Sequence, residues 1–392
     1  MTDPTGALFV AAPERWTRKI AWAVRTLGLS RFQLKYSVGT AERRPPHLHP
    51  AVRRAGHARA CARCSPRTRD HGCAKVDCVN NVEVVTAREV PLGGPRAMSV
   101  RRTLPQRDRS LVGAWCFADH YGPDDVGATG GMDVPPHPHT GLQTVSWLFS
   151  GEIEHRDSGG VHAMVRPGEL NLMTAGHGVA HSEVSTPGTT TLHGVQLWVA
   201  LPDHARDVRR GFDHYVPSVV SMPGGSARVF LGSLAGSTSS VGTFTRLLGA
   251  EVLIDPRSDV TLAVDPGFEH GVLVDVGPVL LDGVALARAE LGYVDTGVDR
   301  LVLTNPGEEP ARVVLLGGEP FEEPLVMWWN FVGRSHDEIV AFREQWQAES
   351  DRFGRVEGYG GFPQHLPAPA LPNARIRPRL HPPGPGDRSA WG

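Results

Sequence analysis

Two short segments carry side chains at a spacing that suits a metal ion. In GMDVPPHPHTG, His137 and His139 are two residues apart, and side chains two apart on an extended strand point to the same face. Farther along, TAGHGVAHSE places His181 and Glu183 at the same spacing. One His-x-His pair is a weak signal. Two pairs on neighbouring strands would supply three imidazole nitrogens and one carboxylate oxygen around a single ion.

Such a ligand set favours chemistry or sensing over a structural role. Three nitrogens and one oxygen leave about two positions of an octahedral ion open to water, dioxygen or a chelating substrate. The same ligands accept manganese, cobalt, nickel, copper and zinc, so the spacing does not select a metal. We expect the metal to be lost as the pH falls below about 6, where free histidines protonate.

The elements that must position these ligands are strands. The chain has 392 residues with 45 glycines and 33 prolines, and 40% of it is apolar, which fits many short strands joined by tight turns. In 143–149, apolar and polar residues alternate as in a half-buried strand. Further strands are expected at 170–175, 189–200, 228–234, 244–254, 271–287, 299–304 and 311–317.

One helix is predicted near the end of the chain. Ser335 and Glu338 form a capping box, and Ile339, Phe342 and Trp346 follow at helical spacing. From about Pro363 a Pro-rich tail is expected to lie on the surface or to be disordered.

The first 78 residues differ from the rest. They hold 15 Lys+Arg against 5 Asp+Glu, whereas the remainder holds 25 against 37. They show no sustained period, and we expect a disordered extension or a mis-annotated start, with translation beginning near Val79. Four of the five cysteines lie there and could form a small zinc knot, a weaker interpretation because the second pair is spaced by four residues: Cys61, Cys64, Cys73 and Cys78.

Several separated motifs, in order, resemble the pirin family. Gly131 to His139 looks like the first cupin motif, and HPHTG, HRDSGG, RPGELNLMTAGHGVAHSE and LHGVQLWVALP resemble pirins. WCFADHYGP upstream and EPLVMWWNFVGRSHDEI downstream also look like bacterial pirins, so the resemblance covers roughly residues 79–372.

The resemblance implies an all-β fold of two cupin (jelly-roll) β-barrels in tandem with one C-terminal helix. We therefore expect a metal-binding barrel at 79–235, a second barrel at 236–350 and a Pro-rich tail at 351–392. It also implies iron, Fe(2+), as the cofactor, held by the three histidines and the glutamate of the two segments.

The sequence departs from the family at two positions near the ligands. Gln143 stands where pirins often have a glutamate, which leaves Glu183 as the only carboxylate of the motifs. His177 stands where arginine is common, and we favour an outer hydrogen-bonding or merely structural role over that of a substitute ligand. His155 is a third candidate for the surroundings of the metal. Asp157, His162 and His193 also flank the metal segments, and for each of these four residues ordinary packing is at least as good an interpretation.

The second barrel should not bind metal, because 244–317 contains no His-x-His and a single histidine. That residue, His270, is expected at a turn or on the surface.

Two functions fit the resemblance. One is a dioxygenase that opens the ring of a flavonol such as quercetin, with Glu183 accepting the substrate proton. The other is a metal-dependent, redox-sensing interaction protein or transcriptional co-regulator with a protein partner and no turnover. We expect no direct nucleic-acid binding. Without an apolar run of about 18 residues or a secretory signal, a cytoplasmic protein with no membrane contact is expected.

Overall fold

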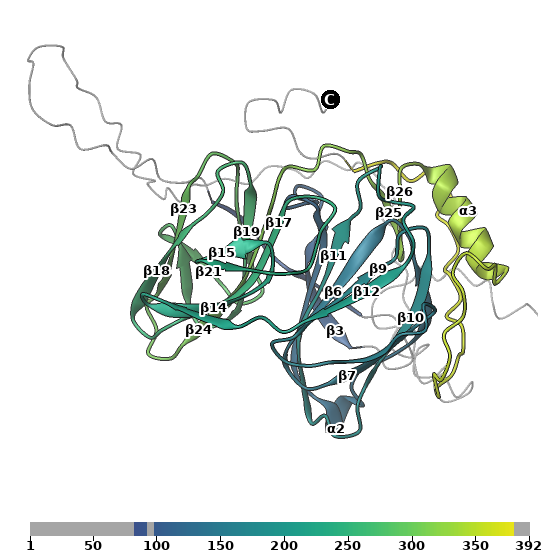
Figure 1. The fold of residues 1–392 in the computed structure, drawn as a ribbon, viewed down its shortest axis with the longest axis horizontal. Coiled ribbons are helices and arrows are strands. Elements are labelled where there is room, and N and C mark those ends of the chain that lie inside the picture. Colours follow the sequence, from purple (N-terminus) through teal and green to yellow (C-terminus); the bar gives the residue numbers. More distant parts are fainter. Residues whose placement is uncertain (1–81, 92–97, 380–392) are drawn as a thin grey trace, which may run out of the picture. The chain divides into compact units, whose positions relative to one another are not determined.

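The computed structural model describes residues 82–91 and 98–379. The predicted extension, its cysteines and its possible zinc knot lie outside these residues. Within them, strands dominate and are arranged as two β-barrels, each built from one seven-stranded and one four-stranded sheet (Figure 1). The expected all-β fold of two cupin barrels is confirmed.

The first barrel holds the expected ligands. Its larger sheet has the order β12-β9-β6-β11-β4-β3-β2, and its smaller sheet has the order β5-β10-β7-β8. The bounds are β2 Arg88–Pro91, β3 Ser99–Leu104, β4 Trp115–Asp125, β5 Asp133–His139, β6 Leu142–Ser150, β7 Ile153–Asp157, β8 His162–Val165, β9 Leu170–Thr174, β10 Val179–Ser185, β11 Thr191–Ala200 and β12 Gly211–Tyr215. A short helix, α2 Val126–Thr129, follows β4.

The second barrel repeats this arrangement. Its larger sheet runs β1-β22-β19-β24-β17-β14-β13, and its smaller sheet runs β18-β23-β20-β21. The bounds are β1 Glu83–Val85, β13 Val219–Met222, β14 Gly225–Leu231, β17 Leu247–Ile254, β18 Ser258–Ala263, β19 Glu269–Val276, β20 Val279–Leu281, β21 Val284–Leu286, β22 Leu291–Val294, β23 Arg300–Asn305 and β24 Ala311–Gly318. The ribbon β15 Ser233–Leu234 and β16 Ser237–Thr238 adjoins it.

The sheet order shifts the division between the barrels from the expected one at 235/236. Strands β13 and β14 pair with the second barrel, so the change of barrel follows β12, which ends at Tyr215. Strand β1 also pairs with β22 of the second barrel, although it precedes the first barrel in the chain.

The two larger sheets share one apolar core. Alternate residues of a strand face opposite sides, so Val145 and Trp147 of β6 pack with Leu273 and Leu316 of the second barrel. The Trp147 indole donates to Glu251 Oε2 at 2.7 Å across this boundary. Ser146, which lies between them on β6, faces the interior of the first barrel, where it contacts Glu183. The interior of the second barrel has its own apolar cluster.

After the second barrel the chain returns to the first. A hairpin of β25 Val326–Trp328 and β26 Phe331–Gly333 leads into helix α3, His336–Gln347 (Figure 1). Ser335 caps α3 by accepting from the Glu338 amide at 3.2 Å, while the Glu338 carboxylate accepts from the Arg334 amide at 2.7 Å. The predicted helix and its start are confirmed.

The Pro-rich tail is anchored as far as it is described. The Leu366 amide donates to Pro136 O at 2.8 Å, and Ala368 packs in the cluster under α3. Of the two expectations for the tail, the surface position holds for 363–379, where most residues are exposed or partly exposed. The Ala368 and Ile376 amides donate to Gln347 and His336 of α3.

Candidate metal centre

The ligand segments form neighbouring antiparallel strands. In their register His181 of β10 lies opposite His137 of β5, and Val179 lies opposite His139. The chain can place the prolines Pro135, Pro136 and Pro138 in β5 because this strand forms the edge of its sheet, where missing N–H groups are tolerated. The register shifts between His181 and Glu183, so Glu183 does not continue the pairing of His181.

Three imidazoles meet inside the first barrel. The Nε2 atoms of His139 and His181 are 3.1 Å apart, and the ring centroids of His137 and His181 are 4.3 Å apart. One nitrogen of each of the three rings lies within 4.8 Å of the others. All three side chains are buried, with at most 6% of the residue surface exposed.

Their hydrogen bonds leave the Nε2 lone pairs free. The Nδ1 of His137 contacts Pro135 O at 2.9 Å, and the Nδ1 of His139 contacts Asn330 O at 3.1 Å. Because a carbonyl oxygen only accepts, each Nδ1 must carry the proton and each Nε2 a lone pair. Metal-binding histidines usually have such outer acceptors.

The third ligand candidate has a side chain as its outer partner. His181 Nδ1 lies 3.4 Å from His155 Nδ1, and His155 Nε2 lies 3.4 Å from Asp157 Oδ2, both long contacts. Asp157 is fixed because its Oδ1 accepts from the amides of Gly159 at 2.7 Å and Val161 at 3.1 Å. If Asp157 accepts from His155 Nε2, then His155 Nδ1 can accept from His181. The order Asp157, His155, His181 therefore turns the His181 Nε2 lone pair toward the other two rings.

Glu183 lies two residues after His181 on β10. It forms a group with His155 and His181, whose ligand atoms also lie within 4.8 Å, rather than with His137 and His139. Its Oε1 accepts from the Ser146 hydroxyl at 3.2 Å. The four expected ligands thus form two groups that share His181. Burial raises the pKa of the Glu183 carboxyl.

Burial also keeps the histidines neutral. It lowers the pKa of His137 to about 4 and holds the pKa values of His139 and His181 well below the usual 6.5. Neutral imidazoles with lone pairs aimed at one point, beside a buried carboxylate, fit a transition metal ion. In a purely structural cluster, two Nε2 lone pairs facing each other at 3.1 Å would repel.

Gln143 and His177, the other two residues predicted to lie around the metal, do not contact the candidate ligands. Gln143 has the strand parity of Trp147, which faces the second barrel, and its amide donates to Thr174 Oγ1 at 2.9 Å. The side chain of His177 is 53% exposed and lies 3.5 Å from Asp207. Ser146 and the backbone of Asn330, which do contact the candidate ligands, were missed. The alternation along 143–149 could have placed Ser146 on the inner face of its strand. The sequence carries no signal for the backbone contact of Asn330, because that residue lies in a distant hairpin.

A third buried group joins the barrels; the sequence singled out His193 in it, whereas His120 and Asp275 were missed. Asp275 Oδ1 accepts from His120 Nε2 at 2.6 Å and from His193 Nε2 at 2.5 Å, while Oδ2 accepts from Arg312 at 2.7 Å. Arg101 donates to the Nδ1 of His120 at 3.1 Å, so the proton of that ring must be on Nε2. With that nitrogen protonated and two guanidinium groups close by, the group is an ion-paired junction rather than a metal site.

The second barrel has apolar residues where the first has ligands. Strands β18 and β23 take the places of β5 and β10 in the sheet order, and they contribute Val260, Leu262, Leu301 and Leu303 to the barrel core. His270 is fully buried on β19, not at a turn or on the surface as expected, because it alternates with Gly271, which faces the first barrel. Burial lowers its pKa to about 4.

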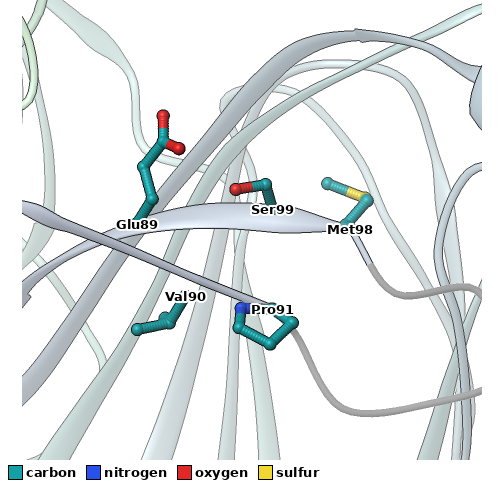
Figure 2. Close-up of a pocket in the computed structure, with 5 residues that line it drawn as sticks. All are labelled: Glu89, Val90, Pro91, Met98 and Ser99. Atoms are coloured by element: carbon teal, nitrogen blue, oxygen red, sulfur yellow. The ribbon is translucent and has the colours of Figure 1, made fainter. Parts of the chain in front are cut away.

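A shallow hollow of about 210 Å³ lies beside β2 and β3, where Figure 2 shows Glu89 and Val90 on opposite sides of the strand. It is lined by Glu89, Val90, Pro91, Met98 and Ser99, none of which belongs to the histidine group. Among the described residues, no helix is long and apolar enough to cross a membrane.

Comparison with known proteins gives matches over both barrels. The chain matches the pirin family over residues 97–199 and the pirin C-terminal cupin domain over 249–354. A Pseudomonas aeruginosa protein named "Putative quercetin 2,3-dioxygenase" is 43% identical over 74% of this chain and 90% of its own length. Human pirin is 30% identical over 61% of this chain and 83% of its own.

A solved structure shares both fold and sequence. The crystal structure of quercetin 2,3-dioxygenase from Acinetobacter baumannii is 38% identical, with a TM-score of 0.71 over 76% of this chain and 97% of that one. Two tandem cupin barrels, one of them with a buried histidine group that could hold a metal ion, define a bicupin. Within that class, the chain belongs to the pirin family.

Proposed function

We propose that this chain holds one iron ion through His137, His139, His181 and Glu183 and opens the ring of a flavonol such as quercetin with dioxygen. The observation that carries the metal assignment is the convergence of the three Nε2 lone pairs, each fixed by an acceptor on the other ring nitrogen. Manganese, nickel, cobalt, copper and zinc suit the same donors. The relatives named as quercetin 2,3-dioxygenase, one of them as putative, support dioxygenase chemistry and a flavonol substrate.

The residues have separable roles in this proposal. When bound, the metal would polarise the 3-hydroxy-4-keto group of the substrate and bring dioxygen beside it. The histidines fix the geometry and stay neutral because they are buried. Glu183 accepts the proton of the substrate 3-hydroxyl, and the Ser146 hydroxyl at 3.2 Å orients the carboxylate for that transfer.

The reaction has a stoichiometry that can be measured. One dioxygen adds to the flavonol and two carbon–carbon bonds of its central ring break. The products are one carbon monoxide and one ring-opened ester. Oxygen uptake and carbon monoxide release should therefore be equal for the iron-loaded protein with quercetin. His137→Ala should abolish both, and His162→Ala, whose side chain is 48% exposed and pairs with Glu154, serves as the control.

A second function is favoured by one observation. The candidate ligands are at most 6% exposed, so a flavonol can reach them only after the barrel opens. A metal-dependent interaction protein without turnover would need no such opening. Turnover absent from both wild type and His137→Ala, with the metal bound by the wild type, would refute the dioxygenase and favour this alternative.

A further inference from the structure

The ligand strand β5 is held on its outer edge by a distant part of the chain. In its sheet β5 pairs only with β10, and an edge strand needs other partners for its exposed backbone groups. The partners come from residues 325–368, which we call the C-terminal segment. It comprises the hairpin β25–β26, helix α3 and the first part of the tail.

Contacts with the C-terminal segment follow β5 from its first residue to its end. At the start the Tyr359 hydroxyl donates to Asp133 Oδ1 at 2.8 Å. In the middle the Leu366 amide donates to Pro136 O at 2.8 Å. At the end Asn330 O accepts from the Nδ1 of the candidate ligand His139.

The hairpin is seated tightly where β5 ends. The Val332 amide donates to Thr140 O at 3.1 Å. Gly141 has φ +66°, and a Cβ there would lie 2.4 Å from Val332 O, so only glycine allows this approach. The tip of the hairpin is thus fixed beside His139.

The same segment covers the outer face of both ligand strands. Ala180, which precedes the candidate ligand His181, packs in a cluster with Phe331, Phe342 and Phe353. Ser158 links these parts, because its hydroxyl donates to Phe353 O at 2.5 Å and accepts from the Ala180 amide at 3.0 Å. In Figure 1 the segment is the yellow-green part of the chain, with α3 next to β10.

Strand β5 binds the segment through backbone acceptors. Pro136, whose carbonyl oxygen accepts from Leu366, and Pro138 of the same strand parity have no N–H to donate on this edge. The positions of His137 and His139 are therefore set from both sides of β5, by the ladder with β10 and by the C-terminal segment. We propose that docking of the C-terminal segment and metal binding are coupled: the docked segment holds the ligand strand in place, and the bound metal holds the segment docked.

This coupling rests on the proposed metal site and must be reciprocal, since each event changes the equilibrium of the other by the same factor. Hydrogen exchange of the full-length protein, with and without zinc as a non-redox probe, tests it directly. Zinc should slow exchange of the Val332 and Leu366 amides, which donate to Thr140 and Pro136. Amides of β18 and β23 in the second barrel should not change.

A variant tests the other direction. Tyr359→Phe removes the hydrogen bond to Asp133 and should weaken zinc binding by up to about fivefold, the effect of one hydrogen bond. Tyr215→Phe, on β12 of the same barrel, should bind zinc like the wild type. Calorimetric titration of variants with unchanged circular dichroism measures both.

The outcomes separate the two proposals. Zinc binding by the wild type with unchanged exchange at Val332 and Leu366, or with equal affinities for Tyr359→Phe and wild type, would overturn the coupling and leave the metal site standing. Failure of the wild type to bind zinc would overturn the metal site and the coupling with it.

Discussion

The Nε2 atoms of His139 and His181 lie 3.1 Å apart inside the first barrel, while the Nδ1 atoms of the two rings face separate partners. The two residues come from neighbouring strands, and their partners come from elsewhere in the chain. Asn330 belongs to the turn of the C-terminal hairpin, and His155 belongs to β7. The centre is therefore assembled from both barrel strands and the returning C-terminal segment.

The orientation of His181 should depend on His155 and Asp157. Replacing His155 by Leu removes the acceptor for the His181 Nδ1 proton, so the metal affinity should fall by about 10- to 100-fold, as for other outer partners of metal ligands. Competition titration with a chromophoric chelator measures this. His162→Leu, on the adjacent strand and about half exposed, is the matched control. Equal affinities for His155→Leu and wild type would remove His155 from the centre.

The pH dependence of metal binding should differ from that of free histidine ligands. Because burial lowers the pKa of His137 to about 4, protons should not compete for the histidines at pH 5–6. The pKa of Glu183 is shifted the other way, above its usual 4.5, so the carboxylate should protonate first as the pH falls. As the pH falls, we expect about one proton to be taken up for each metal ion released, before the affinity falls more steeply near pH 4.

Glu183→Gln separates the two steps in that titration. The variant should bind more weakly at neutral pH but lose the first step and keep the steep loss near pH 4. Release of the metal from the wild type at pH 6, with two or more protons taken up for each ion, would instead match exposed histidines. That result would contradict the buried centre.

The junction between the barrels should stabilise the fold at neutral pH. Burial alone would raise the pKa of Asp275, but hydrogen bonds from His120 and His193, together with Arg312, outweigh it and lower the pKa. A carboxyl with a lowered pKa in the folded state contributes stability above its ordinary pKa of 3.8, and this contribution is lost as the pH falls below that value.

Asp275→Asn should therefore reduce the free energy of unfolding by about 3–5 kcal/mol at pH 7, since it leaves buried donors without their anionic partner. The difference from wild type should shrink below about pH 4. Urea unfolding at both pH values measures it. Asp282→Asn, in the second barrel outside the junction, serves as a control because asparagine keeps an oxygen that can accept from the Val302 amide. A constant difference across this range would contradict the assignment of charge to Asp275.

Much of the architecture follows from the sequence alone. Alternation along 143–149 predicts β6, and the Ser335 cap predicts the start of α3, because both signals are local. The His-x-His and His-x-Glu pairs predict the candidate ligands for the same reason. The division between the barrels was displaced because β13 and β14 resemble strands of either barrel, and only the sheet pairing assigns them.

Long-range contacts account for what sequence could not supply. Asp275 is separated from His120 by 155 residues, and Asn330 from His139 by 191. Neither has a motif of its own. His270 was expected at a turn or on the surface because of its GFEHG context. It lies on β19 instead, where its side chain points into the second barrel and is buried. Gln143 likewise has the correct sequence position for a neighbour of the metal but the wrong strand parity.

The metal content of the purified protein tests the central claim most directly. Elemental analysis of iron-loaded wild type should give one metal ion per chain, and the double variant His181→Ala, Glu183→Ala should give close to none while keeping its circular dichroism. Retention of one ion per chain by the double variant would contradict the centre described by His137, His139, His181 and Glu183.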